Sequence, residues 1–186
     1  MAINQKILAW ARKKIGDKVG DGECWTYVEK AVTKSGGKSS KTLTENFGDK
    51  SDYVWGSEVS LTAVKPGDLL QFQSYRWDSK SIIKVTFEDV ILTLPTGGFN
   101  ERGQPNHSAI VNRVLEGGLV EVLEQNIEPD FKVAKSILRL TPLHLQKRTT
   151  KDKRRHPDTN KLVPVTIETT MNEIVAGKVK AYRAKI

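Results

Sequence analysis

Cysteine is almost absent from this chain: its 186 residues include one, Cys24. A lone thiol cannot form a disulfide within the chain, and it cannot supply a cysteine-rich zinc or iron–sulfur site. Histidine is also sparse, and the three copies are too far apart to form a His-Glu-x-x-His pair on one helix (His107, His144 and His156). The composition therefore gives no reason to expect a metal or another cofactor.

Long apolar runs are missing as well. No stretch approaches the roughly 18 apolar residues that a membrane-spanning helix needs. The first residues, MAINQKILAWARKKIG, contain four cations and no uninterrupted apolar core, so they do not form a secretory signal peptide. We expect synthesis in the cytoplasm without a signal peptide or a membrane span. Action in the periplasm or on a cell wall requires a separate delivery route.

The remaining composition is that of a globular protein, with 38% hydrophobic and 28% charged residues. The length fits one domain, and we expect residues 1–186 to form it. Helical spacing of apolar residues over 3–15 and 24–33 is followed by β-branched segments with turn signals between them. This order predicts an α+β fold, with N-terminal helices packed on a central antiparallel β-sheet.

Positive charge is abundant, with a formal net charge of +8. Such a surface favours anionic partners such as nucleic acid, a wall polymer or an acidic membrane face. Many of the cations lie in QKRTTKDKRRHP, and we expect a solvated basic loop over 146–161; the alternative is electrostatic anchoring to a polyanion. No RNP, zinc-finger or helix-turn-helix signature is present, so we expect no specific nucleic-acid recognition.

Cys24 is the candidate nucleophile. It follows the glycine-containing bend GDKVGDGE and begins the second expected helix. Free N–H groups and the dipole at a helix N-terminus stabilise a thiolate, and the same N–H groups, that of Cys24 first, can stabilise an oxyanion. The alternative is a buried structural cysteine.

His107 is the candidate general base, because it opens the apolar strand HSAIV directly after the polar turn ERGQPN. Glu-Gly-Gly at 116–118 predicts a hairpin between this strand and the segment LVEVLEQN. Glu124 and Asn126 share side-chain parity at the end of that segment, so either can orient the His107 ring. The alternative is a strand end with solvated polar groups.

Five segments in this order resemble the CHAP amidase/peptidase family of the papain-like NlpC/P60 superfamily. They are GDGECWTYVE, YVWG, KPGDLLQF, NHSAIV and LEQN, and they extend from about Gly20 to Asn126. GDGECW and the terminal AYR are also similar to a papain-like domain at the C-terminus of certain fungal actin-patch proteins. The resemblance implies a single CHAP-like catalytic domain, with Cys24 as nucleophile, His107 as base, and Glu124 and Asn126 as orienting groups. Segment 74–105 exceeds what a compact CHAP domain needs, which predicts a flap or hairpin bordering the cleft.

The CHAP resemblance implies a cysteine amidase or endopeptidase that hydrolyses amide bonds in peptidoglycan through a thioester. A lysis enzyme or an exported antibacterial effector fits the missing signal peptide. Partners would then be peptidoglycan or a peptide, an anionic wall polymer, and an immunity protein or a secretion apparatus. The alternatives are a papain-like domain acting on a non-wall protein and a non-catalytic binding module with a basic surface.

Four residues are candidates for substrate binding in the cleft: Trp25, Tyr53, Trp55 and Gln125. The alternative for the aromatic side chains, above all Trp25 and Trp55, is packing in the core.

Overall fold

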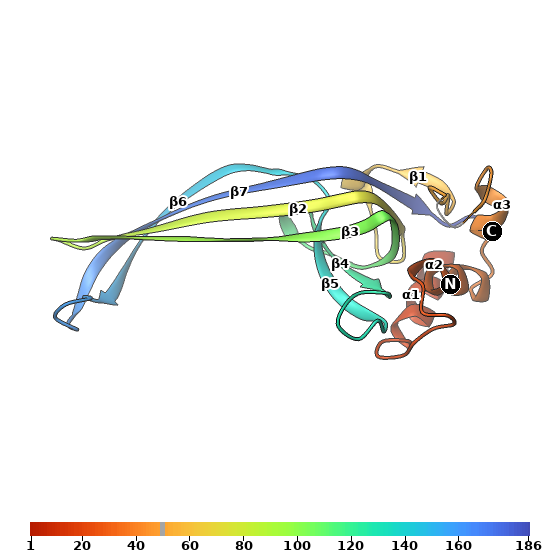
Figure 1. The fold of residues 1–186 in the computed structure, drawn as a ribbon, viewed down its shortest axis with the longest axis horizontal. Coiled ribbons are helices and arrows are strands. Elements are labelled where there is room, and N and C mark those ends of the chain that lie inside the picture. Colours follow the sequence, from red (N-terminus) through yellow and green to blue (C-terminus); the bar gives the residue numbers. More distant parts are fainter. Residues whose placement is uncertain (49–50) are drawn as a thin grey trace. The chain divides into compact units, whose positions relative to one another are not determined.

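The computed structural model describes residues 1–48 and 51–186. In chain order the elements are helices α1 (Ile3–Arg12), α2 (Cys24–Lys34) and α3 (Ser40–Leu43), strand β1 (Ser57–Val59), 3-10 turn η1 (Leu61–Ala63), strands β2 (Leu69–Thr86) and β3 (Ile91–Val114), 3-10 turn η2 (Glu116–Gly118), and strands β4 (Leu119–Glu124), β5 (Ala134–Arg139), β6 (Leu143–Arg155) and β7 (Leu162–Arg183) (Figure 1). The strands form one sheet in the order β1-β7-β2-β3-β4-β5, and β6 pairs with β7.

The fold is mostly antiparallel β-sheet, so the expected α+β class is wrong: 50% of the residues lie in strands and 17% in helices. The excess comes from the long strands β2, β3, β6 and β7. Apolar and polar residues alternate poorly along much of these strands, and β6 is exposed along almost its whole length. Such strands lack the periodic apolar face by which a strand is recognised in a sequence.

The chain forms two compact units. Unit 1 consists of Met1–Arg76, Glu101–Thr141 and Val175–Ile186, and unit 2 consists of Trp77–Asn100 and Pro142–Ile174. Unit 1 holds the helices, β1, β4, β5 and both chain ends, and unit 2 holds β6. No helix among residues 1–48 and 51–186 is long and apolar enough to cross a membrane.

Unit 1 has the main apolar core. Helix α1 buries Ile7, Leu8 and Ala11, and the inward face of α2 packs against it (Figure 1). The same core includes fully buried side chains from three neighbouring strands: Leu69 of β2, Ile110 of β3 and Leu123 of β4. Helix α2 is thus held against β4, and its first residue is fixed relative to the end of that strand.

The turn KPGD attaches the start of β2 to α1. Gly67 has a φ of +85°, and an added Cβ would lie 2.2 Å from the Asn4 carbonyl oxygen, so only glycine fits there. The next residue, Asp68, is fully buried and accepts hydrogen bonds from both nitrogens of the Arg183 fork, at 3.0 and 2.8 Å. This ion pair ties the C-terminal end of β7 to the base of the sheet.

Two segments of unit 2 differ from their expected form. The run 82–92, which reads as one strand, is divided by a turn in which the Phe87 N–H donates to the Val90 carbonyl at 2.9 Å. The expected flap at 74–105 therefore consists of parts of β2 and β3 and this turn.

The expected basic loop at 146–161 is largely strand. Residues through Arg155 lie in β6 and pair antiparallel with β7, from Leu143 opposite Glu173 to Arg155 opposite Leu162. Backbone pairing with β7 makes this charged segment regular, although its side chains remain in solvent.

Candidate active site

Cys24 is the first residue of α2. The preceding residue, Glu23, is extended, with φ of −74° and ψ of 145°, and its N–H donates to the Asp21 carboxylate at 3.0 Å. The helix cannot shift easily, because Tyr27, Val28 and Ala31 are fully buried beneath it. Cys24 is only 9% exposed, and its thiol is free rather than part of a disulfide.

The His107 ring lies between Cys24 and Glu124. Its Nε2 is 2.9 Å from Glu124 Oε2, and the ring also makes a hydrogen bond with the Cys24 side chain. Because Nε2 is used by the carboxylate, the bond to sulfur falls to Nδ1. His107 is 5% exposed and Glu124 is fully buried, so the three side chains form a line shielded from water.

The strand register explains how Glu124 reaches the ring. Ala109 of β3 pairs with Glu124 of β4, so His107 lies two residues along β3 with its side chain on the same face. Diagonal neighbours at this spacing are within reach of long side chains. β4 ends at Glu124, directly before Gln125 and Asn126.

Arg102 is a further member of the site that the sequence analysis missed. Its Nε lies 3.1 and 2.9 Å from the two Glu124 oxygens, and its Nη2 lies 2.7 Å from Oε1. Arg102 is 9% exposed, so a buried forked ion pair holds the carboxylate that also bonds His107. A usable signal was present: a buried Glu124 needs a cation, and Arg102 lies in the polar turn before His107.

The pKa values are displaced toward an ion pair of thiolate and imidazolium. Burial raises the pKa of Cys24, but the hydrogen bond and charge of His107 and the backbone N–H groups of Ser108 and Trp25 outweigh it, so the net shift is downward from 9.0. Burial lowers the pKa of His107, whereas its bonds to Cys24 and Glu124 raise it to about 9.

Glu124 remains ionised in this setting. Burial alone would raise the pKa of its carboxyl, but the hydrogen bonds and positive charges of His107 and Arg102 lower it to about 2. The carboxylate therefore keeps its negative charge next to the ring across the neutral pH range. Among the described residues, no group of three or more His, Cys, Asp or Glu side chains could hold a metal ion.

The two residues after Glu124 bind the bend before α2 instead of His107. The Asn126 side chain donates to Glu23 Oε2 at 3.0 Å, and the residue has a positive φ of 69°, which carries its side chain away from the strand face. Gln125 is fully buried: it accepts from the Val19 N–H at 2.6 Å and donates to the Val19 and Glu23 carbonyls at 3.1 Å. Gln125 thus fixes the bend and does not line a pocket that includes Cys24.

The predicted aromatic candidates divide between pocket and core. Trp25 and Tyr53 line a pocket of about 510 Å³ beside Cys24, together with Phe47 and Lys41, which the sequence analysis did not select. The Lys41 ammonium lies 5.2 Å from the Trp25 ring centroid. Trp55 is fully buried, and its Nε1 donates to Gln71 at 3.1 Å, so it is a core residue.

Cys24 borders two depressions of unit 1. The aromatic pocket lies on one side, and a polar pocket of about 460 Å³ lies on the other, lined by Arg102, His107 and Asn126 among others. Glu23, Cys24, Pro105 and Asn106 line both. An extended molecule that occupied both pockets would pass over the sulfur atom. The arrangement can therefore present a bond of a bound chain to an activated thiol.

Comparison with known proteins gives two individual similarities. One is to altered inheritance of mitochondria protein 3 of Debaryomyces hansenii, 29% identical over 143 residues, which covers 72% of this chain and 14% of that protein. The chain thus spans a small part of this relative. The other is to the solved structure described as the crystal structure of Ly7917 with the hydrolyzing product of MDP, at 15% identity and a TM-score of 0.41, covering 100% of this chain and 94% of that one. A likeness of this strength assigns neither fold nor function.

The match to a family model is far more extensive, since the model of the AIM3/BBC1 cysteine proteinase-fold domain covers residues 2–185. It includes the whole site around Cys24 and both units. The cysteine-proteinase part of the expected resemblance is supported, whereas membership of the CHAP or NlpC/P60 families is not. The chain belongs to the AIM3/BBC1 cysteine proteinase-fold domain family.

Proposed function

We propose that this chain is a cysteine hydrolase that cleaves an amide bond of a polypeptide, with Cys24 as nucleophile. The observation that carries the proposal is the buried line Cys24–His107–Glu124, whose pKa shifts favour a thiolate beside an imidazolium. A purely structural cysteine needs neither a histidine partner nor a lowered pKa. The two pockets that meet at the sulfur give a substrate access to it.

The steps follow from these positions. The Cys24 thiolate attacks the amide carbonyl carbon, and the oxyanion forms near the free N–H groups at the start of α2, where the Cys24 amide is the donor that we propose. His107 gives its proton to the leaving nitrogen as the C–N bond breaks and a thioester remains. Neutral His107 then takes a proton from water, the resulting hydroxide attacks the thioester, and the thiolate leaves.

Two further residues act as positioning residues in this proposal. Arg102 keeps the Glu124 carboxylate ionised and aimed at the ring, which fixes the tautomer and orientation of His107. Gln125 holds the bend that places Cys24 at the helix start. The Asn126 side chain donates to Glu23, whereas Glu124 bonds the His107 ring, so we assign to Glu124 the orienting role that the sequence left open between the two.

A polypeptide is a better candidate substrate than peptidoglycan. The matched family is named for a cysteine proteinase fold, and the relative is named for the inheritance of mitochondria. The peptidoglycan hypothesis has only the resemblance of short motifs in its support. The roles of lysis enzyme and antibacterial effector, and partners such as an immunity protein, rest on the same motifs.

The decisive experiment is the incubation of the protein with a diverse mixture of synthetic peptides, followed by mass spectrometry of the products. Purified peptidoglycan is digested in parallel. We expect cleaved peptides with the native chain and with Lys34→Ala, an exposed change on the same helix, and none with Cys24→Ala. Equal cleavage by Cys24→Ala contradicts the nucleophile assignment. Cleavage of peptidoglycan alone would replace the proposed substrate, and a lack of any cleavage would favour a binding module.

A further inference from the structure

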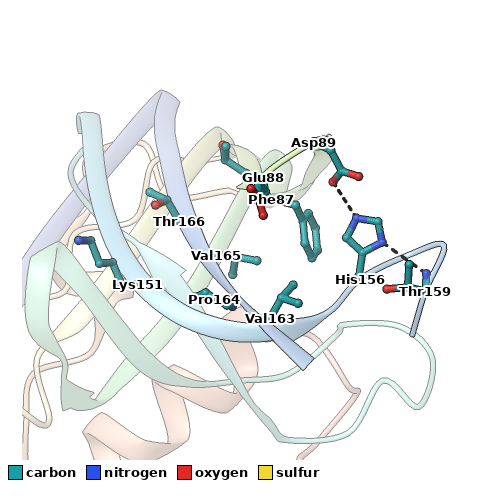
Figure 2. A pocket seen from close by; sticks show the side chains of 11 residues that line it. Phe87, Glu88, Asp89, Lys151, His156, Thr159, Val163, Pro164, Val165 and Thr166 are labelled. Atoms are coloured by element: carbon teal, nitrogen blue, oxygen red, sulfur yellow. Dashed lines mark hydrogen bonds and ion pairs between the residues drawn. The ribbon is translucent and has the colours of Figure 1, made fainter. Parts of the chain in front are cut away.

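Unit 2 contains a hollow that is separate from the site around Cys24. Its volume is about 710 Å³, and its lining comes from the turn after β2 and from β6, β7 and the turn between them. Figure 2 shows Phe87, Val163 and Val165 around the hollow, with Lys151 at one end and the Asp89–His156 pair at the other. We call this cavity the unit 2 hollow.

Packing and hydrogen bonds hold several of the side chains that line the hollow. Phe87 and Val165 belong to the small apolar core of unit 2, and the edge of the Phe87 ring meets the His156 ring at a centroid distance of 5.3 Å. His156 is 8% exposed, and its Nε2 lies 2.8 Å from Asp89 Oδ1. Its Nδ1 accepts from the backbone N–H groups of Asp158 and Thr159 at 3.3 and 3.4 Å. Both ring nitrogens have hydrogen-bond partners, so the His156 side chain is held in one orientation at the wall of the hollow.

Unit 2 leaves much apolar surface in water. Its core cluster has three buried residues, and several large apolar side chains are at least 49% exposed: Ile82, Ile91, Leu94, Phe99, Leu145, Leu162 and Ile174. Exposed apolar surface and an apolar hollow are both features of proteins that bind another molecule.

The charges near the hollow indicate what that molecule is. Strand β6 carries three cations of the same side-chain parity, Lys147, Lys151 and Lys153, and none of them has an ion-pair partner among the described residues. Lys151 lines one end of the hollow, whereas Glu88 and the paired Asp89 line the other part (Figure 2). An occupant therefore gains from negative charge on the Lys151 side alone.

We propose that the unit 2 hollow binds a linear peptide segment of a partner protein, with a bulky apolar side chain in the hollow and acidic residues along β6. A recessed apolar surface accepts a projecting apolar side chain. The carboxylates of Glu88 and Asp89 at the same opening would also repel an anionic lipid surface. A peptide with acidic residues on one side of its apolar side chain matches both the Lys151 end and the Glu88–Asp89 end of the hollow.

The test uses a fluorescein-labelled peptide with one phenylalanine followed by a run of glutamates. Its matched controls have glycine in place of phenylalanine or glutamine in place of glutamate. Binding to the full chain is measured by fluorescence polarisation, and the site is mapped by amide shifts in NMR. We expect binding of the first peptide only, with amide shifts at 86–89, 163, 165 and 166.

Two protein variants, each with a control, separate the apolar and the charged contributions. Thr166→Trp fills the hollow, and we expect it to weaken binding roughly tenfold or more. Ser57→Trp, an exposed change in β1 of unit 1, should have no effect. Lys151→Glu should weaken binding roughly two- to fivefold at low salt, and Lys132→Glu in unit 1 should not.

Several results would overturn the proposal. They are no binding of the phenylalanine–glutamate peptide, binding that Thr166→Trp and Lys151→Glu leave unchanged, or amide shifts confined to unit 1. Vesicles of phosphatidylcholine and phosphatidylserine are tested in parallel, and binding of vesicles without binding of the peptide would identify a lipid surface instead. Each readout measures binding, so the result does not depend on hydrolysis at Cys24.

Discussion

Replacement of Arg102 by methionine tests the ion pair that supports the proposed active site. The change keeps an unbranched side chain of similar reach but removes the cation. Glu124 is then fully buried with His107 as its remaining charged partner. Removal of one member of a buried ion pair typically costs about 3–5 kcal/mol, because the other charge is left uncompensated. Such a loss is a large part of the roughly 5–15 kcal/mol that stabilises a typical protein.

The measurement is urea unfolding at pH 7, followed by tryptophan fluorescence and by far-ultraviolet circular dichroism. Arg154→Met is the matched control, since Arg154 makes a 2.9 Å contact with Asp152 but the two side chains are 58% and 48% exposed. An exposed pair contributes roughly 0–1 kcal/mol, so this variant should unfold almost like the native chain.

The double variant Arg102→Met with Glu124→Gln supplies the decisive comparison. It removes the buried negative charge that the single change leaves behind, so we expect it to be more stable than Arg102→Met alone. If Arg102→Met and Arg154→Met destabilise the chain equally, or if the double variant is the least stable of all, the reasoning about a buried charge at Glu124 is wrong.

The site and the residues that support it lead to four further predictions. The pH dependence of Cys24 alkylation by iodoacetamide should have its midpoint below the ordinary pKa of 9.0. His107→Asn should raise that midpoint, because the charge of His107 that lowers the pKa is lost; an unchanged midpoint would refute the ion pair. Hydrolysis should decline on the alkaline side as pH rises through about 9, where His107 loses the proton that it gives to the leaving nitrogen, which a pH–rate profile measures. Gln125→Met should destabilise the chain by roughly 2–3 kcal/mol in urea unfolding, because buried backbone groups of the bend lose their partners, and native stability would contradict this role. Gly103→Ala should cost about 1–3 kcal/mol, since φ is +74° and the new Cβ would lie 2.8 Å from the His107 nitrogen, whereas Gly98→Ala has open space; equal melting temperatures would count against the strain.

The local features around Cys24 could be predicted from the sequence. A bend rich in glycine and aspartate followed by apolar residues at helical spacing placed Cys24 at a helix start, and α2 begins there. Alternation along the segment 119–126 placed Glu124 on the face of the sheet that His107 shares, and the register of β3 and β4 has this arrangement. These features depend on neighbours in the chain, which a sequence records directly.

Features that depend on distant partners were beyond the sequence. Asn126 has the right parity for His107, but β4 ends before it and its side chain turns to Glu23. Trp55 is as aromatic as Trp25, yet only the structure distinguishes the core from the pocket wall. Strand β6 carries charged side chains along its length and is held by backbone pairing with β7. Its sequence therefore contains no apolar pattern that would identify a strand. The resulting excess of strand is what overturned the α+β class.

Glu124 and Gln125 are consecutive residues with different tasks, one holding His107 and the other holding the bend before Cys24. Successive side chains of a strand point to opposite faces, so Glu124 and Gln125 reach different partners. The position of Cys24 relative to His107 is therefore set by two consecutive residues. Inserting or deleting a single residue within β4 would exchange the two side chains between the faces of the sheet and undo both attachments at once. The turn at 116–118 before that strand has no such constraint. Natural length variation in this hairpin should therefore occur in the turn and be absent from β4, which begins at Leu119.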